Sequence, residues 1–205
     1  AWLLQKTHFL KPKFLMKHFL NQLTLLSKLV LLTVVSMSGL ITVSVYLMTD
    51  VKAHDRKGRE AQIRATVESA NGVLTWAYQM EVLGKMPREE AQTLAKQAIA
   101  QMRYGKDEYF FISDMEVPAK FVMHPIKPEL NGQSVHAADG SALLDTFARK
   151  VQTEKTGLVS YLWPRPGNET PVEKVSYVQG FTPWGWIIGS GLYMDDLRAE
   201  FFGYA

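Results

Sequence analysis

A long uncharged run near the start of the chain dominates its hydropathy pattern. No charged residue occurs between positions 29 and 49, and most side chains there are aliphatic. About 20 apolar residues in a helix span the roughly 30 Å hydrocarbon core of a bilayer. A buried core helix and a cleaved signal peptide are the alternatives, but the run is long for a signal peptide and no cleavage motif follows it. We predict a basic leader at 1–28, a transmembrane helix at 29–49 and an extracytoplasmic domain at 50–205.

Residues 51–83 have the periodicity of one long helix. Apolar residues recur there at alternating spacings of four and three. The first stripe consists of Ile63, Val67, Ala70, Leu74 and Ala77. The second stripe consists of Val73, Trp76, Met80 and Leu83. One stripe can pack on the chain's own sheet while the other meets a second helix or subunit; a helix with one broad core face explains the pattern equally well. Pro87 predicts the start of a second helix, with Glu89 and Glu90 in its first turn.

The periodicity changes to two after Arg103, which indicates strands. We predict them at 109–113, 120–123, 158–163, 173–181 and 186–193. A short helix at 141–153 interrupts them, and Asp195-Asp196 is expected to cap a terminal helix. Helices first and closely spaced strands afterwards predict an α+β fold with an antiparallel sheet.

The charge of the chain is divided unevenly. Residues 1–49 hold five lysines and no acidic residue, whereas the rest of the chain holds 18 basic and 20 acidic side chains. The basic pI of about 9.0 therefore comes from the leader. Lysines there suit the anionic cytoplasmic face of a membrane, so we expect a membrane partner and no nucleic acid. The chain has no cysteine, which excludes disulfides and cysteine-ligated metals.

Motifs for catalysis are absent from the sequence. It contains no nucleophile elbow, no zinc-protease motif and no phosphate-binding loop. His124, His136 and Asp139 are too loosely spaced to indicate a metal site. We therefore expect no enzyme, no cofactor and no metal, with a membrane-anchored hydrolase as a remote alternative.

Aromatic and cationic residues are concentrated in the predicted strands. Tyr109 and Phe111 share one face of their strand, as do Tyr161 and Trp163 of theirs. A cation with phenol hydroxyls inside an aromatic wall suits a small organic anion. The alternative is a plain aromatic core, with Arg103 and Lys174 facing solvent.

Several of these segments occur together in one known family. The stretch at 103–112, the tripeptide at 123–125, and the later stretches at 157–164, 171–178 and 184–196 resemble the single-Cache sensor domain of bacterial chemoreceptors, the methyl-accepting chemotaxis proteins. The resemblance covers residues 50–205. It implies a PAS-like antiparallel sheet packed on a long amino-terminal helix. It also implies a second transmembrane helix, a HAMP domain and a cytoplasmic signalling region, which we expect beyond residue 205.

The resemblance also implies a pocket for short carboxylates such as acetate, propionate or pyruvate. In that pocket we assign anion recognition to Arg103, Lys174 and His124. Hydroxyl hydrogen bonds are assigned to Tyr109, Tyr161 and Tyr177, and apolar walls to Phe111 and Trp163.

Signalling is expected to follow from a population shift caused by the ligand. The two ends of the domain would be displaced relative to each other, within a homodimer joined along the helical seam. Cross-linking at Ile63 or Val67 should then respond to ligand. The output would be a chemotaxis kinase complex; the alternatives are a sensor histidine kinase or a diguanylate cyclase.

Overall fold

A computed structural model describes residues 24–105 and 108–194 of the chain, without the side chains at 50–55. The chain divides into two compact units, residues 1–55 and 56–205. Each unit is described by itself. The expected terminal helix at Asp195-Asp196 lies outside the described residues.

The first unit contains the beginning of helix α2, Leu25–Val82. Its segment Leu25–Thr49 is long and apolar enough to cross a membrane, and its side chains are exposed. The hydroxyls of Thr33 and Thr42 donate to the carbonyl oxygens of Leu29 and Ser38, at 2.9 and 2.8 Å. A hydroxyl that is satisfied within its own helix is compatible with a lipid environment. This apolar segment begins four residues before the predicted span.

The second unit is built on a six-stranded antiparallel sheet. Its strands are β1 Arg103–Tyr104, β2 Glu108–Asp114, β3 Phe121–Met123, β4 Thr156–Pro164, β5 Pro171–Phe181 and β6 Trp186–Tyr193. The order is β1-β2-β6-β5-β4, and β3 pairs with β2 at Ile112 and Ser113, beyond the residues that pair with β1. The chain is therefore α+β with a PAS-like antiparallel sheet, which confirms the predicted fold class.

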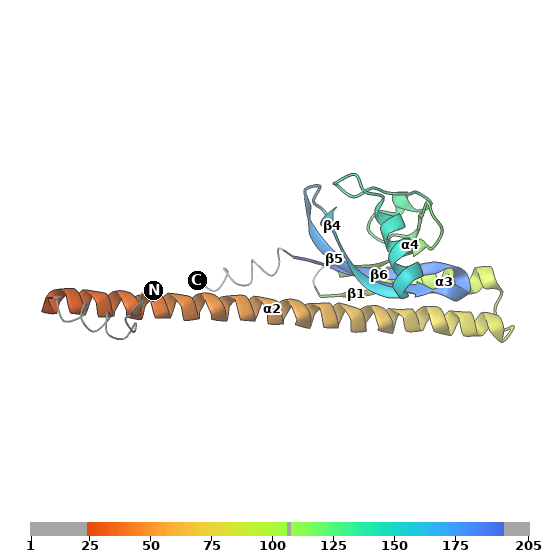
Figure 1. The fold of residues 1–205 in the computed structure, drawn as a ribbon. Helices are drawn as coiled ribbons and strands as arrows, with labels where there is room; N and C mark the ends of the chain where they lie inside the picture. Colours follow the sequence, from red (N-terminus) through yellow and green to blue (C-terminus); the bar gives the residue numbers. More distant parts are fainter. Residues whose placement is uncertain (1–23, 106–107, 195–205) are drawn as a thin grey trace, which may run out of the picture. The chain divides into compact units, whose positions relative to one another are not determined.

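Helices cover the two faces of this sheet (Figure 1). On one face, the part of α2 from Arg56 onward and helix α3, Arg88–Gln101, share a hydrophobic core with the sheet. On the other face lies helix α4, Leu143–Glu154, whose Phe147 and Val151 pack in a second core with Val178 and Ile187. The strands alternate between the two cores because successive side chains point to opposite faces.

The first helical stripe is the domain's own core. All five of its residues are buried and belong to the same cluster as Phe110 and Ile188 of the sheet. Ile63 and Val67 are therefore unavailable for a seam between subunits, and the expectation of cross-linking there is wrong. In the second stripe, Trp76 is 44% exposed and Leu83 is 63% exposed.

Two of the helices begin close to the predicted positions. Helix α3 starts directly after Pro87 and carries Glu89 and Glu90 in its first turn. Helix α4 starts at Leu143, two residues later than predicted. There the Asp139 carboxylate accepts hydrogen bonds from the backbone N–H and the hydroxyl of Ser141, at 2.9 and 2.7 Å. This Asx turn holds Ser141 outside the helix.

Candidate ligand-binding site

One cross-strand row of the sheet carries a buried cation between two phenols. Lys174 of β5 is paired in register with Tyr161 of β4 on one side and with Tyr193 of β6 on the other. Directly paired residues in a sheet point to the same face. Tyr109 of β2 reaches the row as well, because the Lys174 Nζ donates to its phenol oxygen at 3.1 Å.

The Lys174 side chain is enclosed by aromatic groups. It is 1% exposed, and its Nζ also lies 3.4 Å from the Tyr193 phenol oxygen. The Nζ sits 4.2 Å from the ring centre of Tyr109 and 4.6 Å from that of Tyr193. Within the part of the chain whose side chains are described, Lys174 forms no ion pair. Burial lowers the pKa of Lys174 to about 7; the negative charge of Glu108 opposes this shift and the positive charge of Arg165 adds to it.

His124 lies beside this cluster as a neutral donor. It follows β3, is 2% exposed, and its ring centre is 5.0 Å from that of Tyr109. The backbone N–H of Lys127 donates to the His124 Nδ1 at 3.0 Å, which assigns the ring proton to Nε2. Burial lowers the pKa of His124 to about 3, together with the positive charges of Lys174 and Lys127. The imidazole therefore stays uncharged at neutral pH and offers an N–H.

Aromatic rings form a continuous wall around the cluster. The ring of Phe147 in α4 is stacked on that of Phe111, with 5.5 Å between the ring centres. Its centre is also 5.5 Å from that of the Tyr161 ring. The ring centres of Tyr161 and Trp163 are 6.2 Å apart, as are those of Trp163 and His124. The Tyr161 hydroxyl is held by the Ser176 hydroxyl at 2.8 Å. The wall is apolar apart from the partnered Tyr161 hydroxyl and the ring nitrogens of Trp163 and His124.

Two glycines of β6 leave room for these side chains. A Cβ at Gly191 would overlap the Lys174 Cε and the Ser176 Oγ, and a Cβ at Gly189 would overlap the Phe111 ring. The side chains from β5 and β2 therefore lie directly over the β6 backbone, which only glycine permits. Successive residues of a strand point to opposite faces. Gly189 and Gly191 therefore lie on the face of Tyr193, opposite to that of Ile188.

The structure brings together six of the eight predicted site residues: Lys174, His124, Tyr109, Tyr161, Phe111 and Trp163. Arg103 of β1 is paired in register with Tyr109, but its exposed guanidinium is directed away from the cluster and donates to the carbonyl oxygens of Ala100 and Met102, both at 2.7 Å. Tyr177 lies on the opposite face of the sheet, in the core shared with α2. The ligand-binding role of the six clustered residues stays a prediction.

Tyr193 was not among the predicted site residues. Its phenol oxygen lies between the Lys174 Nζ and the Pro164 carbonyl oxygen, to which it donates at 3.0 Å. The signal was present in the sequence, since Tyr193 stands two residues after Gly191 and four after Gly189 in a predicted strand. These three positions share one face, and the strand beside them carries Lys174.

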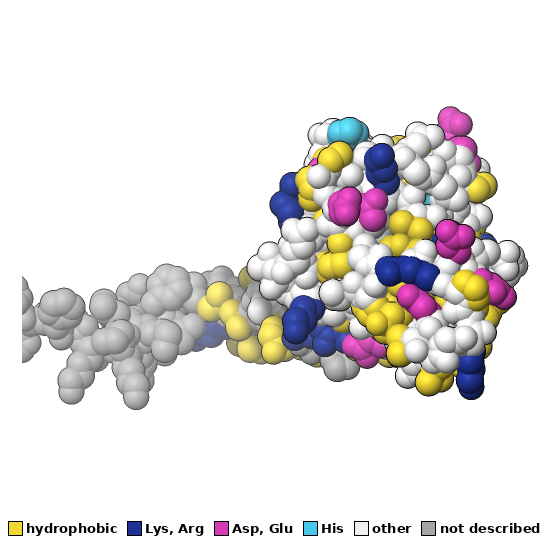
Figure 2. All heavy atoms as spheres, turned by 90° about the vertical axis from the view of Figure 1, so that its right-hand side faces the viewer, with side chains coloured by type: hydrophobic (Ala, Val, Ile, Leu, Met, Phe, Trp, Pro, Cys, Tyr) yellow, Lys and Arg dark blue, Asp and Glu magenta, His cyan; other side chains and the backbone are white. Residues whose placement is uncertain are grey.

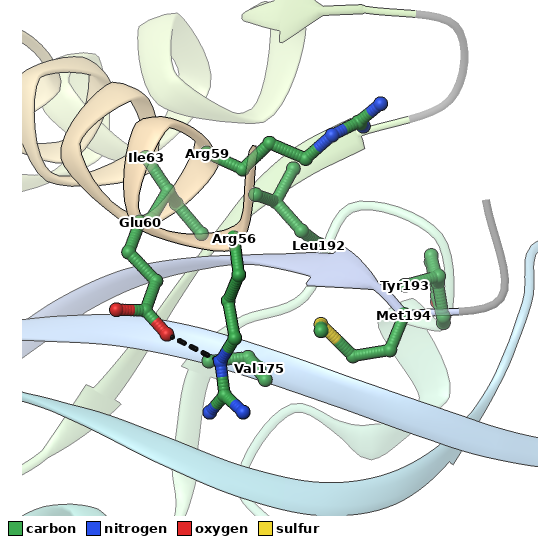
Figure 3. Close-up of a pocket in the computed structure, with 8 residues that line it drawn as sticks. All are labelled: Arg56, Arg59, Glu60, Ile63, Val175, Leu192, Tyr193 and Met194. Atoms are coloured by element: carbon green, nitrogen blue, oxygen red, sulfur yellow. Dashed lines mark hydrogen bonds and ion pairs between the residues drawn. The ribbon is translucent and has the colours of Figure 1, made fainter. Parts of the chain in front are cut away.

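A separate pocket lies on the α2 face of the second unit (Figure 3). Ile63, Val175, Leu192 and Met194 form its apolar lining, and the Arg56–Glu60 ion pair of 2.8 Å stands at its side. Tyr193 is the residue that this pocket shares with the Lys174 cluster. Two arginines line this pocket (Figure 3): Arg56, which is paired with Glu60, and Arg59.

Charge on the surface of the second unit is mixed. Figure 2 shows acidic and basic side chains interspersed on the viewed face, with no large field of one sign. Among the described residues, no group of three or more His, Asp or Glu side chains is arranged to hold a metal ion.

One protein family matches nearly the whole second unit. Residues 56–204 match the family described as Single Cache domain 2. The chain belongs to this single Cache family. This confirms the resemblance that the sequence segments indicated.

Relatives of this single Cache chain include a chemoreceptor. The methyl-accepting chemotaxis protein McpP of Pseudomonas putida is 36% identical over 185 residues, which cover 89% of this chain and 34% of McpP. The chain therefore spans about a third of the length of that relative. The sensor histidine kinase MctS of Rhizobium johnstonii is 31% identical over 115 residues, 52% of this chain and 24% of MctS.

A solved Cache structure resembles the domain. It is described as "Structural basis for carboxylic acid recognition by a Cache chemosensory domain". It superposes with a TM-score of 0.65 at 39% identity, over 68% of this chain and 95% of the solved chain.

Proposed function

We propose that the chain is the input part of a membrane chemoreceptor that binds a short carboxylate. The observation that carries this proposal is the buried Lys174, which has two phenols but no carboxylate as described partners. A buried charge without a counter-ion is unfavourable, and a carboxylate ligand supplies the missing partner. The similarity to a Cache domain described as recognising carboxylic acids supports the same ligand class.

Each clustered side chain has a role in this proposal. Lys174 pairs with the carboxylate, and the phenol of Tyr109 and the Nε2–H of His124 donate to its oxygens. The Tyr193 phenol donates to the Pro164 carbonyl oxygen and accepts from Lys174, so it positions the lysine. Phe111, Trp163 and Tyr161 contact the apolar tail of the ligand. Acetate, propionate and pyruvate match one cation and an apolar wall. Arg103 and Tyr177 have no role in this site.

The membrane arrangement follows the sequence-based prediction. The leader at 1–28 is cytoplasmic, the helix around 29–49 spans the inner membrane, and the single Cache domain at 50–205 lies in the periplasm. Ligand binding favours one conformation of the domain, and the change passes through α2 within a homodimer to a chemotaxis kinase complex. No catalytic step is part of this function.

A second candidate is the input domain of a sensor histidine kinase. The similarity to MctS favours it, and a diguanylate cyclase would use the same input. The gene sequence after residue 205 separates these outputs: a HAMP domain with a methylated coiled coil supports the chemoreceptor, and a kinase or cyclase domain contradicts it. A remaining alternative, a membrane-anchored hydrolase, predicts turnover of small esters.

Titration calorimetry on the 205-residue protein in lipid nanodiscs tests the ligand class. We expect heats of binding with acetate, propionate or pyruvate, and none with propionamide, which lacks the charge. Lys174→Met should abolish binding, whereas Lys150→Met should retain it, because Lys150 is at the surface with Glu154. No heat and no thermal shift with any carboxylate of two to four carbons would contradict the proposal.

A further inference from the structure

The groups that face Lys174 come from every element packed against it. β2 contributes Tyr109, β4 Tyr161 and β6 Tyr193, while His124 follows β3 and Phe147 of α4 has no titratable group. Three charged groups lie further out: Glu108, whose charge favours the ammonium, Arg165, whose guanidinium is 4.5 Å from the Tyr193 ring centre, and Lys127, whose Nζ is 5.9 Å from the Trp163 ring centre.

Lys174 is the member of this cluster that changes charge near neutral pH. The pKa of His124 is lowered to about 3 by burial, so the imidazole stays neutral. Burial raises the pKa of Tyr109 to about 12, and it also raises the pKa values of Tyr161 and Tyr193. Burial lowers the pKa of Lys174 to about 7, so that about half of the ligand-free molecules carry a neutral amine at that pH.

We propose that the Lys174 site takes up a carboxylate and a proton together, so that the sensor responds to its ligand and to pH jointly. This inference rests on the proposed function. The geometry that supports it is a cation enclosed by phenol oxygens and ring faces, with no described anionic partner. The neutral amine of Lys174 accepts one proton from solvent and becomes an ammonium paired with the bound carboxylate. No other bond is made or broken.

The direction of the coupling follows from linkage. A bound carboxylate stabilises the ammonium and raises the pKa of Lys174, so binding must take up protons at any pH between the free and bound values. Free carboxylic acids are ionised above about pH 6, and the ligand itself therefore contributes no pH dependence there. Apparent affinity should fall about tenfold from about pH 6 to about pH 8.

Calorimetry on the 205-residue protein in nanodiscs tests this coupling with acetate and propionate as probes. Titrations at one pH near 7.5 in phosphate and in Tris, whose ionisation enthalpies differ, give the number of protons taken up per ligand. We expect more than half a proton, and an affinity about ten times weaker at about pH 8 than at about pH 6. Lys174→Arg keeps a permanent charge, so a folded variant should bind without proton uptake. Lys150→Met should behave like the natural protein.

The outcomes separate this inference from the proposed function. Carboxylate binding with equal enthalpies in both buffers and equal affinity across this pH range overturns the proton coupling and leaves the proposed function intact. Absence of carboxylate binding at every pH overturns both. The comparison of buffers uses the natural protein, so it decides the question even where Lys174→Arg does not fold.

Discussion

Lys174 is the residue at which stability and ligand binding are expected to oppose each other. A buried charge that has only phenols around it destabilises the ligand-free domain, and a hydrophobic side chain of similar length removes that penalty. We expect Lys174→Met to raise the free energy of unfolding by up to about 4 kcal/mol, while carboxylate binding is lost. Urea unfolding without ligand measures the first effect and calorimetry the second.

The matched control for this variant is Lys150→Met on α4. Lys150 forms a surface ion pair of 2.8 Å with Glu154, and such pairs contribute less than about 1 kcal/mol. Lys150→Met should therefore change neither the free energy of unfolding nor carboxylate binding appreciably. A Lys174→Met protein that is strongly destabilised would show that the ammonium supports the fold, which contradicts the role proposed here.

The strand periodicity placed some of the site residues but not their partners. It put Tyr161 and Trp163 on one face, and the same parity separates Tyr177 from Lys174, which stands three positions earlier in β5. That separation could have been predicted. The neutral state of His124 could not, since it depends on burial, and its tautomer depends on the backbone N–H of Lys127. The direction of the Arg103 guanidinium depends on local hydrogen bonds to the Ala100 and Met102 carbonyl oxygens, which strand periodicity does not indicate.

Strand β6 leaves room for the site because two of its residues, Gly189 and Gly191, have no side chain. A Cβ at Gly191 meets the Lys174 Cε, so Gly191→Ala must displace the lysine stem. We expect a loss of stability of about 1–3 kcal/mol, together with weaker carboxylate binding, measured by urea unfolding and calorimetry on the same protein.

Gly72→Ala is the control for that substitution. Gly72 lies on an exposed turn of α2, and outside its chain neighbours and the nearby helix backbone no atom lies within 4 Å of the position that an alanine Cβ would take there. Alanine should therefore stabilise the helix by up to about 1 kcal/mol. If Gly191→Ala were as stable as the natural protein and bound ligand equally well, the close approach of Lys174 to β6 would be required for neither stability nor binding.

The types of the helices and strands and their order along the chain were predictable from the sequence, but some of their first and last residues were not. β6 was predicted with its observed bounds because aromatic residues, Trp186 and Tyr193, stand at both ends of the segment. The helix from residue 51 proved to be part of α2, which begins at Leu25. A change from apolar to charged side chains alters the surroundings of a helix without breaking its backbone hydrogen bonds, so the pattern gave two segments where the chain forms one helix.

The burial of the first helical stripe changes how dimerisation is tested. Leu74 is buried in the domain's own core, whereas Trp76 on the neighbouring stripe is exposed. The chain has no natural cysteine, so single substitutions are unambiguous. In membranes we expect Trp76→Cys to form disulfide-linked dimers at a rate that acetate changes, and Leu74→Cys to form none. Equal rates with and without acetate would contradict a signal carried along α2.

The domain as a whole should lose stability as the pH falls, because two buried groups bind protons more weakly when folded. Unfolded lysine and histidine have pKa values of about 10.4 and 6.5, whereas burial lowers those of Lys174 to about 7 and His124 to about 3. The unfolded chain therefore binds more protons, and the free energy of unfolding rises with pH. Lys174 contributes this rise between about pH 7 and 10, and His124 between about pH 3 and 6.5.

Urea unfolding of the ligand-free protein across pH should therefore show increasing stability from about pH 7 to 9, by up to about 1.4 kcal/mol per pH unit. Lys174→Met should remove this slope while keeping the acid loss that belongs to His124. Saturating acetate should flatten it, since a bound carboxylate keeps Lys174 protonated in the folded state. A slope that persists unchanged in Lys174→Met would assign it to another group. The same proton that destabilises the empty domain is the one the ligand-bound domain requires, so acidification should weaken the fold while strengthening the site.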